Sequence, residues 1–397
     1  MIRRHGLFLL SCLLAFTAGH MFNYTVILYL QEAVGSDLLA GLGFALAFGS
    51  SIVFGWFAGV VCDRVAPGRV IHAAQSMFLL GLACLWWADT GAAAGLRPAW
   101  ALVGAFAGGL AWSFVGPARL TTLGQIASAA ELRPLTILFN LQVLVGFGLA
   151  PLVIGLVRSR AGWPQVMAVG ALGFVASSAL LFGLKTHANP ARGTGSVWAD
   201  IAEGFRTVGA APRLKALMIA TVIAYAMTGP MQILLPKLAR QELGLSEAQR
   251  GAYLGLLALC LIVGGVLALL LARRLHHGLT ILGGVMLGSL LFALLAIIAT
   301  PILSALVLAC VGVLGGMVVS LVVAGIQVQA PPAARGRVMS MYAITSQVLP
   351  AMSGLAAGAL VGQVGLRPAI AAAGLGMAAI AAIAALALPV LRRHPGR

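Results

Sequence analysis

Long apolar segments separated by short polar gaps run along almost the whole chain. Each is about 20 residues long or longer, the length that an α-helix needs to cross the hydrocarbon core of a bilayer. The charged residues gather in the gaps, where they avoid the cost of burial in lipid. The pattern therefore predicts an all-α integral membrane protein with twelve transmembrane helices. The predicted spans are residues 6–30, 38–62, 69–88, 99–118, 135–157, 164–184, 214–236, 251–272, 278–299, 302–325, 339–363 and 367–390.

One long polar gap, residues 185–213, divides this pattern into six spans and six. The end of the gap has apolar residues at helical spacing, which favours a short amphipathic helix along the membrane surface; a disordered linker is the alternative. We therefore expect an N-terminal six-helix bundle over residues 1–184 and a C-terminal six-helix bundle over residues 214–397. The apolar face of the short helix consists of Trp198, Ile201, Phe205 and Val208.

An internal repeat supports this division. Residues 127–133, before the fifth span, resemble residues 330–337, before the eleventh span, about half the chain later. The charged turn of residues 55–69 also has a weaker counterpart at residues 273–278, which lacks the aspartate. Two pseudo-symmetric bundles with corresponding turns indicate alternating access, in which a central site opens to each side in turn.

The composition agrees with a membrane protein and excludes several other classes. Of the 397 residues, 61% are hydrophobic and 9% are charged, which is too apolar for a soluble core. The net charge of +16 does not indicate nucleic-acid binding, because the basic residues lie in the gaps between spans. The five cysteines lack metal-ligand spacing, and the chain lacks enzyme motifs, so we expect no metal, no cofactor and no catalysis.

The distribution of basic residues predicts the orientation. Eighteen of the 25 Lys and Arg residues fall on the same side as the N-terminus, so both termini are expected in the cytoplasm. Residues 1–30 have the charge of a signal peptide, but their apolar stretch is long enough to span, and we interpret them as a retained first helix. The expected location is the bacterial inner membrane.

The turn between the second and third spans has the most distinctive charges. Gly55 and Gly59 let a neighbouring helix approach closely, and Asp63, Arg64 and Arg69 follow at the membrane surface. Charge-assisted contacts from these side chains to a helix end would hold one conformation and break in the other, which predicts a gating role. Simple anchoring at the surface is the alternative.

The run G-x3-G-x3-D-R-x4-R in this turn resembles the signature of the major facilitator superfamily, and the twelve-helix plan agrees over the whole chain. Residues 146–155 are similar to the glycine-rich motif of its antiporters, with Ala150 where glycine is usual. Residues 116–119 and 335–342 are similar to the subgroup of siderophore and drug exporters that contains the bacterial enterobactin exporter. The resemblance implies export coupled to inward proton movement. It adds to the gating candidates Arg119, Gly146, Pro151, Arg335 and Arg337.

Polar residues inside the spans predict the substrate site. Two helices that the repeat relates, the first and the seventh, each carry a polar stripe on one face, and the repeat sets Tyr225 against His20. The candidates are His20, Asn23 and Tyr24 on the first helix and Tyr225, Thr228 and Gln232 on the seventh. Single polar residues on other helices are further candidates, for which helix–helix hydrogen bonding is the alternative. They are Trp112, Gln142 and Gln347.

All nine acidic residues lie at span ends or in loops, so no carboxylate is expected in mid-membrane. His20 is then the mid-span side chain whose ordinary pKa, about 6.5, suits proton exchange, and we predict that it couples transport to protons. A neutral, structural histidine is the alternative. A cavity without fixed negative charge favours neutral or anionic amphipathic compounds over cations.

These observations predict a secondary active transporter that exports a small amphipathic compound, siderophore-like or drug-like, by alternating access with proton antiport. The expected partners are this substrate, protons and membrane lipids, and the expected state is a monomer. Two alternatives stay open: a facilitator or a lipid or metabolite transporter without proton coupling, and a non-transporting membrane receptor or scaffold.

Overall fold

The structure is a computed structural model that describes residues 2–188, 197–271, 276–331, 334–387 and 389. Regular structure in these residues is helical throughout. Eleven helical segments are long and apolar enough to cross a membrane, and α7, with 17 residues, supplies a shorter twelfth. The predicted class, an all-α membrane protein with twelve spans, is confirmed.

The chain forms two compact units. The first unit contains residues 1–195 together with residues 246–255, and it holds the first six spans, one of which is formed by α2 and α3 together. Its helices are α1 (Ile2–Glu32), α2 (Asp37–Gly49), α3 (Ser51–Arg64), α4 (Pro67–Thr90), α5 (Arg97–Ile126), α6 (Ala129–Arg158) and α7 (Trp163–Ala179).

The second unit contains residues 196–245 and 256–397. It begins with α8 and continues with the other six spans, of which the first is formed by α9 and α10 and ends in a π-helical turn, Leu238–Glu242. Its helices are α8 (Val197–Ala210), α9 (Pro212–Ala226), α10 (Thr228–Lys237), α11 (Glu247–Leu271), α12 (His277–Leu294), α13 (Pro301–Gln329), α14 (Arg335–Val364) and α15 (Leu366–Ala387). The first turns of α11 belong to the first unit.

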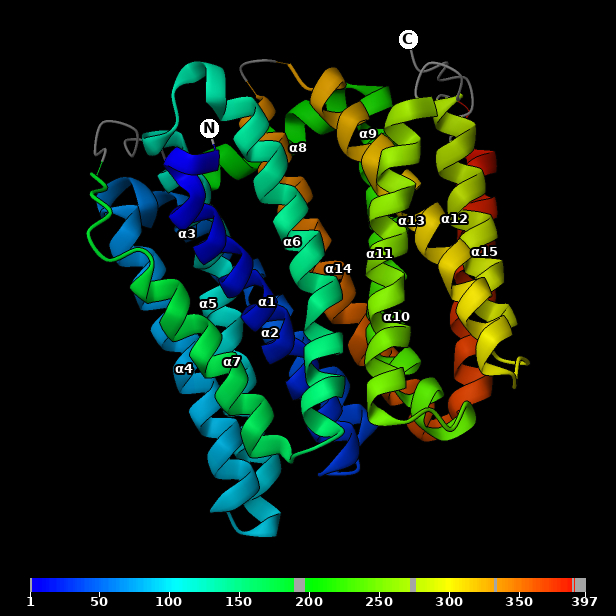
Figure 1. Ribbon diagram of the computed structural model, residues 1–397. Helices are drawn as coiled ribbons and strands as arrows, with labels where there is room; N and C mark the ends of the chain where they lie inside the picture. The colour runs from blue at the N-terminus through cyan, green and yellow to red at the C-terminus, as the bar shows by residue number, and fades with distance from the viewer. Residues whose placement is uncertain (1, 189–196, 272–275, 332–333, 388, 390–397) are drawn as a thin grey trace. The chain divides into compact units, whose positions relative to one another are not determined.

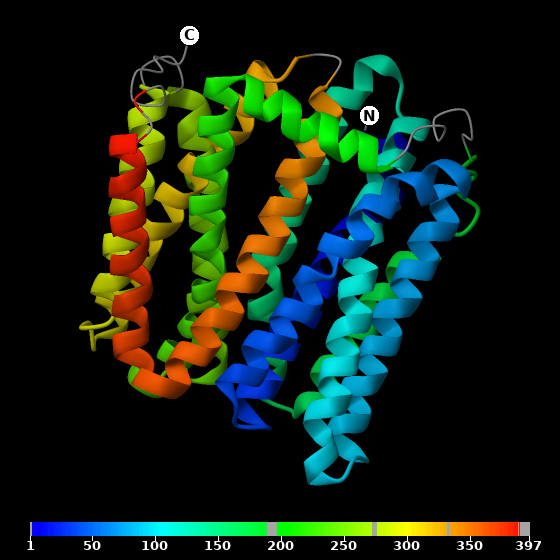
Figure 2. The ribbon, with the colours of Figure 1, turned by 180° about the vertical axis from the view of Figure 1, so that it is seen from behind.

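In the first unit, α1 packs along α6 and α7, and α4 packs along α5 (Figures 1 and 2). The α4–α5 pair approaches closely at Gly81 and Gly104: a Cβ at either position would lie less than 3 Å from the carbonyl oxygen of the other. The helices begin at ordinary start signals. Pro67 opens α4, and Ser128 and Glu131 form a capping box at the start of α6.

The second predicted span is interrupted at Ser50, between α2 and α3. The Ser50 hydroxyl donates to the Leu46 carbonyl over 2.6 Å, and Gly109 of α5 packs directly against Ser50 and Leu46. A hydroxyl that bonds back into its own helix often bends it, and a small neighbour leaves room for the bend.

The predicted amphipathic helix is present as α8, which packs on α9 and α14 within the second unit. Gly204 lies against the Met341 side chain of α14, and Val208 is buried. Phe205, by contrast, is 62% exposed. The side chains of Trp198 and Ile201 lie outside the described residues. Of the other two residues of the predicted face, Val208 packs inward and Phe205 faces outward.

Candidate functional site

Three of the predicted site residues meet inside the first unit. His20 and Asn23 lie one turn apart on α1, with 9% and 4% of their surface exposed, and both contact Trp112 of α5. Trp112 Nε1 donates to Asn23 Oδ1 over 3.1 Å, and the ring centroids of Trp112 and His20 are 5.1 Å apart. We call this group the α1–α5 cluster.

Aromatic rings surround the α1–α5 cluster. Phe147 of α6 lies 5.3 Å from the His20 ring in an edge-on arrangement. Phe48 and Phe78 lie 6.2 and 5.6 Å from the Trp112 ring. Gly19 leaves the room that Trp112 needs, because a Cβ there would lie 2.7 Å from its ring. The surroundings are therefore apolar faces that hold two polar side chains.

Two polar atoms of this cluster have no hydrogen-bond partner among the described residues: His20 Nε2 and Asn23 Nδ2. Both are buried, and a buried polar group without a partner costs free energy. Native proteins retain such groups chiefly where a ligand or water completes them. These two atoms are therefore the unsatisfied polar groups of the cluster.

Two other predicted residues of the first unit lie beside the cluster or away from it. Tyr24 is buried, and its ring lies 5.9 Å from Phe147. Gln142 of α6 donates to the Leu9 carbonyl of α1 over 2.9 Å, three turns from His20 along that helix. Its position fits the alternative role, a hydrogen bond between helices.

The second unit contains the remaining substrate candidates. Tyr225 of α9 and Tyr342 of α14 form a hydrogen bond between their hydroxyls at 2.6 Å. Thr228 opens α10 just after the break at Met227, and Gln232 is 9% exposed. Gln347 is half-buried on α14. Tyr342 was not predicted as a site residue, although it stands at the end of the motif that begins at Arg335.

Arg119 does not lie at the end of a span, where the sequence analysis placed it. α5 continues to Ile126, and Arg119 is completely buried within it. Its guanidinium donates to Ser11 Oγ at 3.1 Å, Cys12 Sγ at 3.2 Å and Ser177 Oγ at 2.8 Å. No carboxylate forms an ion pair with it among the described residues. Only hydrogen bonds to neutral groups therefore offset the free-energy cost of removing this charge from water.

The Arg119 network continues through hydroxyl and amide groups to α4. Ser177 also accepts from Gln75 Nε2 at 2.7 Å, Ser178 donates to Gln75 Oε1, and His72 lies 3.3 Å from the Ser178 hydroxyl. This chain joins α1, α4, α5 and α7. We call it the Arg119 network.

An ion-pair cluster that the sequence did not predict lies at the C-terminal end of α1. Glu32, the last residue of α1, pairs with Arg250 at 2.7 Å and with Arg158 at 3.4 Å. Glu247 completes the group, 3.4 Å from Arg158 and 2.5 Å from Arg250. Arg158 also stacks 4.3 Å above the Trp163 ring. The i,i+3 spacing of Glu247 and Arg250 was the one local signal; the other partners are far apart in sequence.

The glycine-rich motif of α6 lies at close helix crossings. A Cβ at Gly146 would meet the α1 backbone at Phe16 and Thr17. A Cβ at Gly155 would lie 2.5 Å from the Glu247 carbonyl, and Gly251 of α11 lies against Pro151 in the same way. Gly146, Pro151 and Gly155 thus lie at close helix contacts, which is also what ordinary packing residues would do. Whether the crossing moves during transport stays a prediction.

The charged turn joins α3 to α4, as predicted. Arg64 and Arg69 are exposed, while the exposure of Gly59 and the side chain of Asp63 are not among the described features. Arg69 lines a hollow of about 310 Å³ together with His72 and Lys185. In the other half, Arg335 and Arg337 are exposed in the first turn of α14. The gating roles of these residues, and of Gly55, stay predictions.

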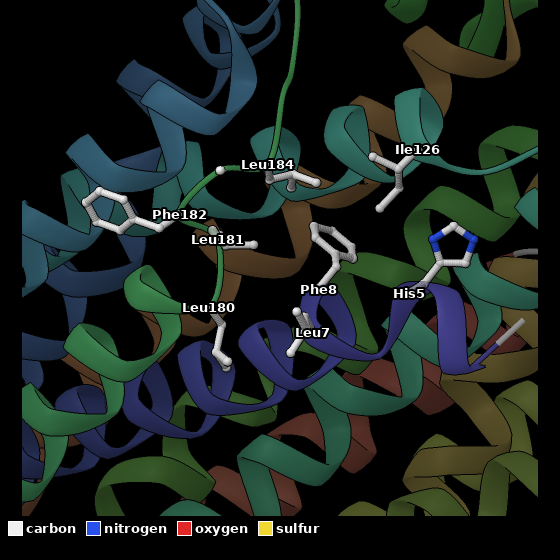
Figure 3. Close-up of a pocket in the computed structure, with 9 residues that line it drawn as sticks. His5, Leu7, Phe8, Ile126, Leu180, Leu181, Phe182 and Leu184 are labelled. Carbon is white, nitrogen blue, oxygen red and sulfur yellow. The ribbon is translucent and has the colours of Figure 1, made fainter.

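A further hollow of about 410 Å³ lies at the start of α1 (Figure 3). Leu7 and Phe8 face Leu181 across it, while His5 stands at its edge, 3.5 Å from Glu131 Oε2. Among the residues that line it, His5 has the only polar side chain. No group of metal-ligating side chains is found among the described residues.

Two six-span units, close helix–helix contacts at glycine residues and buried polar side chains inside a bundle are typical of polytopic α-helical transporters. The model of the Major Facilitator Superfamily matches residues 8–354, and the chain belongs to this family. Membership of this family places it among transporters rather than enzymes.

Solved structures share this fold at low sequence identity. One is a POT family transporter in complex with 5-aminolevulinic acid, with a TM-score of 0.77, 13% identity and coverage of 98% of this chain and 96% of that one. The nucleoside transporter NupG has a TM-score of 0.74, 14% identity and coverage of 97% and 99%. A bacterial homologue of the human lysosomal transporter Spinster has a TM-score of 0.70, 14% identity and coverage of 99% and 98%. A search of curated proteins finds no match.

Proposed function

We propose that this protein is a secondary active transporter that exports a small amphipathic neutral or anionic compound, siderophore-like or drug-like, by alternating access and in exchange for protons. The observation that carries the proposal is the α1–α5 cluster. It offers two buried polar atoms without partners, surrounded by aromatic faces, inside a protein of a transporter family. Such a combination of apolar walls and a few unpaired polar groups is typical of small-molecule sites.

The substrate class follows from charge. Ion-pairing carboxylates of the described residues stand near helix ends, as Glu32, Glu131 and Glu247 do, and none accompanies the cluster. A cationic substrate would therefore lack a counter-ion, whereas a neutral or anionic one would not. The structurally similar POT family transporter, which was solved in complex with 5-aminolevulinic acid, agrees with a small-molecule substrate.

His20 is the proposed proton-linked residue. It is buried in the cluster, and its Nε2 has no partner in the described chain. Imidazole gains or loses a proton near physiological pH when it is accessible to water, and alternating access would supply that access in turn from each side. Proton binding and substrate binding at one residue would couple the two fluxes.

The proposed gate has two parts. The ion-pair cluster of Glu32, Arg158, Glu247 and Arg250 is partly buried and joins three helix ends. The charged turn at Asp63 to Arg69 and the buried Arg119 are the candidates near the other end of the spans. Charge clusters of this kind form in one state and break in another.

The proposed setting is the bacterial inner membrane, with both termini in the cytoplasm, a monomeric chain and lipids as neighbours. The excess of Lys and Arg on the side of the N-terminus supports this orientation.

The test is transport in vesicles that contain the purified protein and a panel of amphipathic compounds of each charge class. We expect accumulation of neutral or anionic compounds that depends on an imposed pH gradient, with movement opposite to that of protons. Empty vesicles and vesicles with the His20→Gln variant are the controls. No flux of any compound at any gradient would reject the transport proposal.

A facilitator is the second candidate, because no carboxylate of the described residues is seen in the middle of a span. The same assay separates the two. A facilitator equilibrates its substrate at the same rate with and without a pH gradient, whereas an antiporter accumulates it only with one.

A further inference from the structure

The two unpaired polar atoms of the α1–α5 cluster have hydrogen-bond roles that their neighbours determine. An indole N–H can only donate, so the Asn23 atom 3.1 Å from Trp112 Nε1 must be the carbonyl oxygen. The other end of the amide, Nδ2, is then the atom that is buried without a partner. Trp112 therefore orients Asn23 so that it presents a donor.

The His20 ring is oriented in a similar way. The backbone of Val143 on α6 lies beside the ring, while Nε2 has no partner among the described residues. Val143 lies inside α6, where its N–H is engaged by the helix, so its carbonyl is the group that can accept from the ring. Donation from Nδ1 toward this carbonyl leaves Nε2 as the acceptor of a neutral imidazole. His20 therefore presents an acceptor.

The charged side chains of the neighbouring helices stand away from Asn23 Nδ2 and His20 Nε2. The nearest charged side chain on α5 is Arg119, two turns from Trp112, and its guanidinium is bound to Ser11, Cys12 and Ser177. α7 has no charged side chain, and those of α2, α4 and α6 stand within the first or last two turns of their helices. A neutral ligand is thus favoured over a charged one.

Building on the transport function proposed above, we infer that the α1–α5 cluster selects a neutral aromatic compound in which a carbonyl oxygen and a hydroxyl lie close together. The carbonyl accepts from Asn23 Nδ2, and the hydroxyl donates to His20 Nε2. The ring of the compound packs against the faces of Trp112 and Phe147, which flank His20 at 5.1 and 5.3 Å. Asn23 and His20 are the residues that determine specificity, and Trp112 positions Asn23.

Three small probes with the same ring test this inference by calorimetric titration of the full chain in lipid nanodiscs. α-Hydroxyacetophenone carries a carbonyl and a hydroxyl, acetophenone carries the carbonyl alone, and 2-phenylethylamine carries only a cationic donor. We expect α-hydroxyacetophenone to bind about tenfold more tightly than acetophenone, the effect of about one buried hydrogen bond. We expect 2-phenylethylamine to bind at least about tenfold more weakly than acetophenone.

Three variants change the hydrogen-bonding groups of the α1–α5 cluster. Asn23→Asp replaces the donor by an acceptor with negative charge, so 2-phenylethylamine should bind more tightly than acetophenone. His20→Phe removes the acceptor, so α-hydroxyacetophenone and acetophenone should bind equally. Trp112→Phe removes the group that orients the Asn23 amide, so the preference for acetophenone over 2-phenylethylamine should narrow even if the other two variants fold poorly.

Tyr29→Phe is the matched control. The Tyr29 hydroxyl lies on the same helix and is likewise buried without a partner among the described residues, but it lies near Trp163, outside the cluster. The ranking of the three probes should not change in this variant. A change there as large as in Asn23→Asp would show that the cluster does not determine specificity.

Other outcomes also decide the matter. If the wild-type chain binds none of the probes, or binds 2-phenylethylamine as tightly as α-hydroxyacetophenone, the inference is wrong. Vesicle transport decides the proposed function separately. If the protein transports a compound but does not rank the three probes as expected, the inference is wrong and the proposed function stands. If it ranks the probes as expected but transports no compound, the proposed function is wrong.

Discussion

The two units of this protein share a plan of six spans but differ in the polarity of their interiors. Of the sixteen polar or charged side chains that are buried in the described residues, twelve lie in the first unit. The four in the second unit are Thr221, Gln232, Ser289 and Ser304. Burying polar groups costs free energy unless each one finds a partner, so a polar interior is kept where it serves binding or specificity. The comparison supports the proposal that the first unit recognises the ligand, and the predictions below test whether the second unit takes part.

The largest expected effect concerns how much the buried polar groups of the first unit contribute to the free energy of unfolding. Ser177→Ala removes an acceptor of both Arg119 and Gln75 and leaves the buried guanidinium with fewer partners. We expect the free energy of unfolding to fall by about 3 kcal/mol, because an under-satisfied buried charge is costly. Denaturant titration in detergent micelles measures the loss.

Ser289→Ala is the counterpart in the second unit. Ser289 is equally buried, but no charged group depends on it among the described contacts. The expected loss is about 0.5 kcal/mol. Equal losses in the two variants would show that the Arg119 network is no more important for stability than an ordinary buried serine.

The second prediction concerns coupling. His20→Gln keeps a polar side chain of similar reach and removes the titratable group of the α1–α5 cluster. We expect pH-gradient-driven accumulation in vesicles to fall by about tenfold or more, because the cluster then has no titratable group to couple the two fluxes. Exchange of labelled for unlabelled substrate without a gradient should continue.

Thr221→Val is the control for the His20 variant. Thr221 is buried in the second unit, and its hydroxyl bonds only to the Leu217 carbonyl of its own helix among the contacts described. Accumulation should stay within about twofold of the wild type. Unchanged accumulation in His20→Gln would instead support a structural histidine.

The third prediction compares ion pairs. Arg250→Gln removes a guanidinium that binds two carboxylates in the first unit, Glu32 at 2.7 Å and Glu247 at 2.5 Å. We expect the transport rate to change by about fivefold, because a partly buried, multiply paired charge contributes about 1 kcal/mol to the balance between states. Initial rates in vesicles, corrected for the amount of inserted protein, measure the change.

Arg367→Gln removes a single pair of the second unit, in which Arg367 Nε binds Glu242 at 2.7 Å. Arg367 is 41% exposed, and exposed pairs contribute little. Its rate should change by less than about twofold. If the two variants had the same effect, the cluster would be an ordinary surface ion pair rather than a gate.

The sequence predicts the spans well and the partners of polar residues poorly. Hydropathy ends a span at its first charge, and this rule placed Arg119 outside the fourth span. The guanidinium is instead buried, because hydroxyls at Ser11 and Ser177, on helices far away in sequence, solvate it. Local patterns carry no information about such partners.

The site residues illustrate the same limit. Periodicity placed His20 and Asn23 on one face, and in the structure both are buried beside Trp112. That Trp112 donates to Asn23, 89 residues away, depends on helix packing. The ion pair of Glu32 with Arg250 spans 218 residues and was likewise beyond a reading of the sequence.

The smallest expected effect concerns the tyrosine pair of the second unit. The hydroxyls of Tyr225 and Tyr342 lie 2.6 Å apart, so each satisfies the other without a ligand. If the pair is structural, Tyr225→Phe and Tyr342→Phe should each lower the free energy of unfolding by about 1 kcal/mol, and the double variant should lose little more than either one. Substrate affinity should change by less than about twofold in all three. A larger loss of affinity, with stability unchanged, would assign ligand recognition to the second unit as well, because only a hydroxyl that binds substrate would change affinity without changing stability.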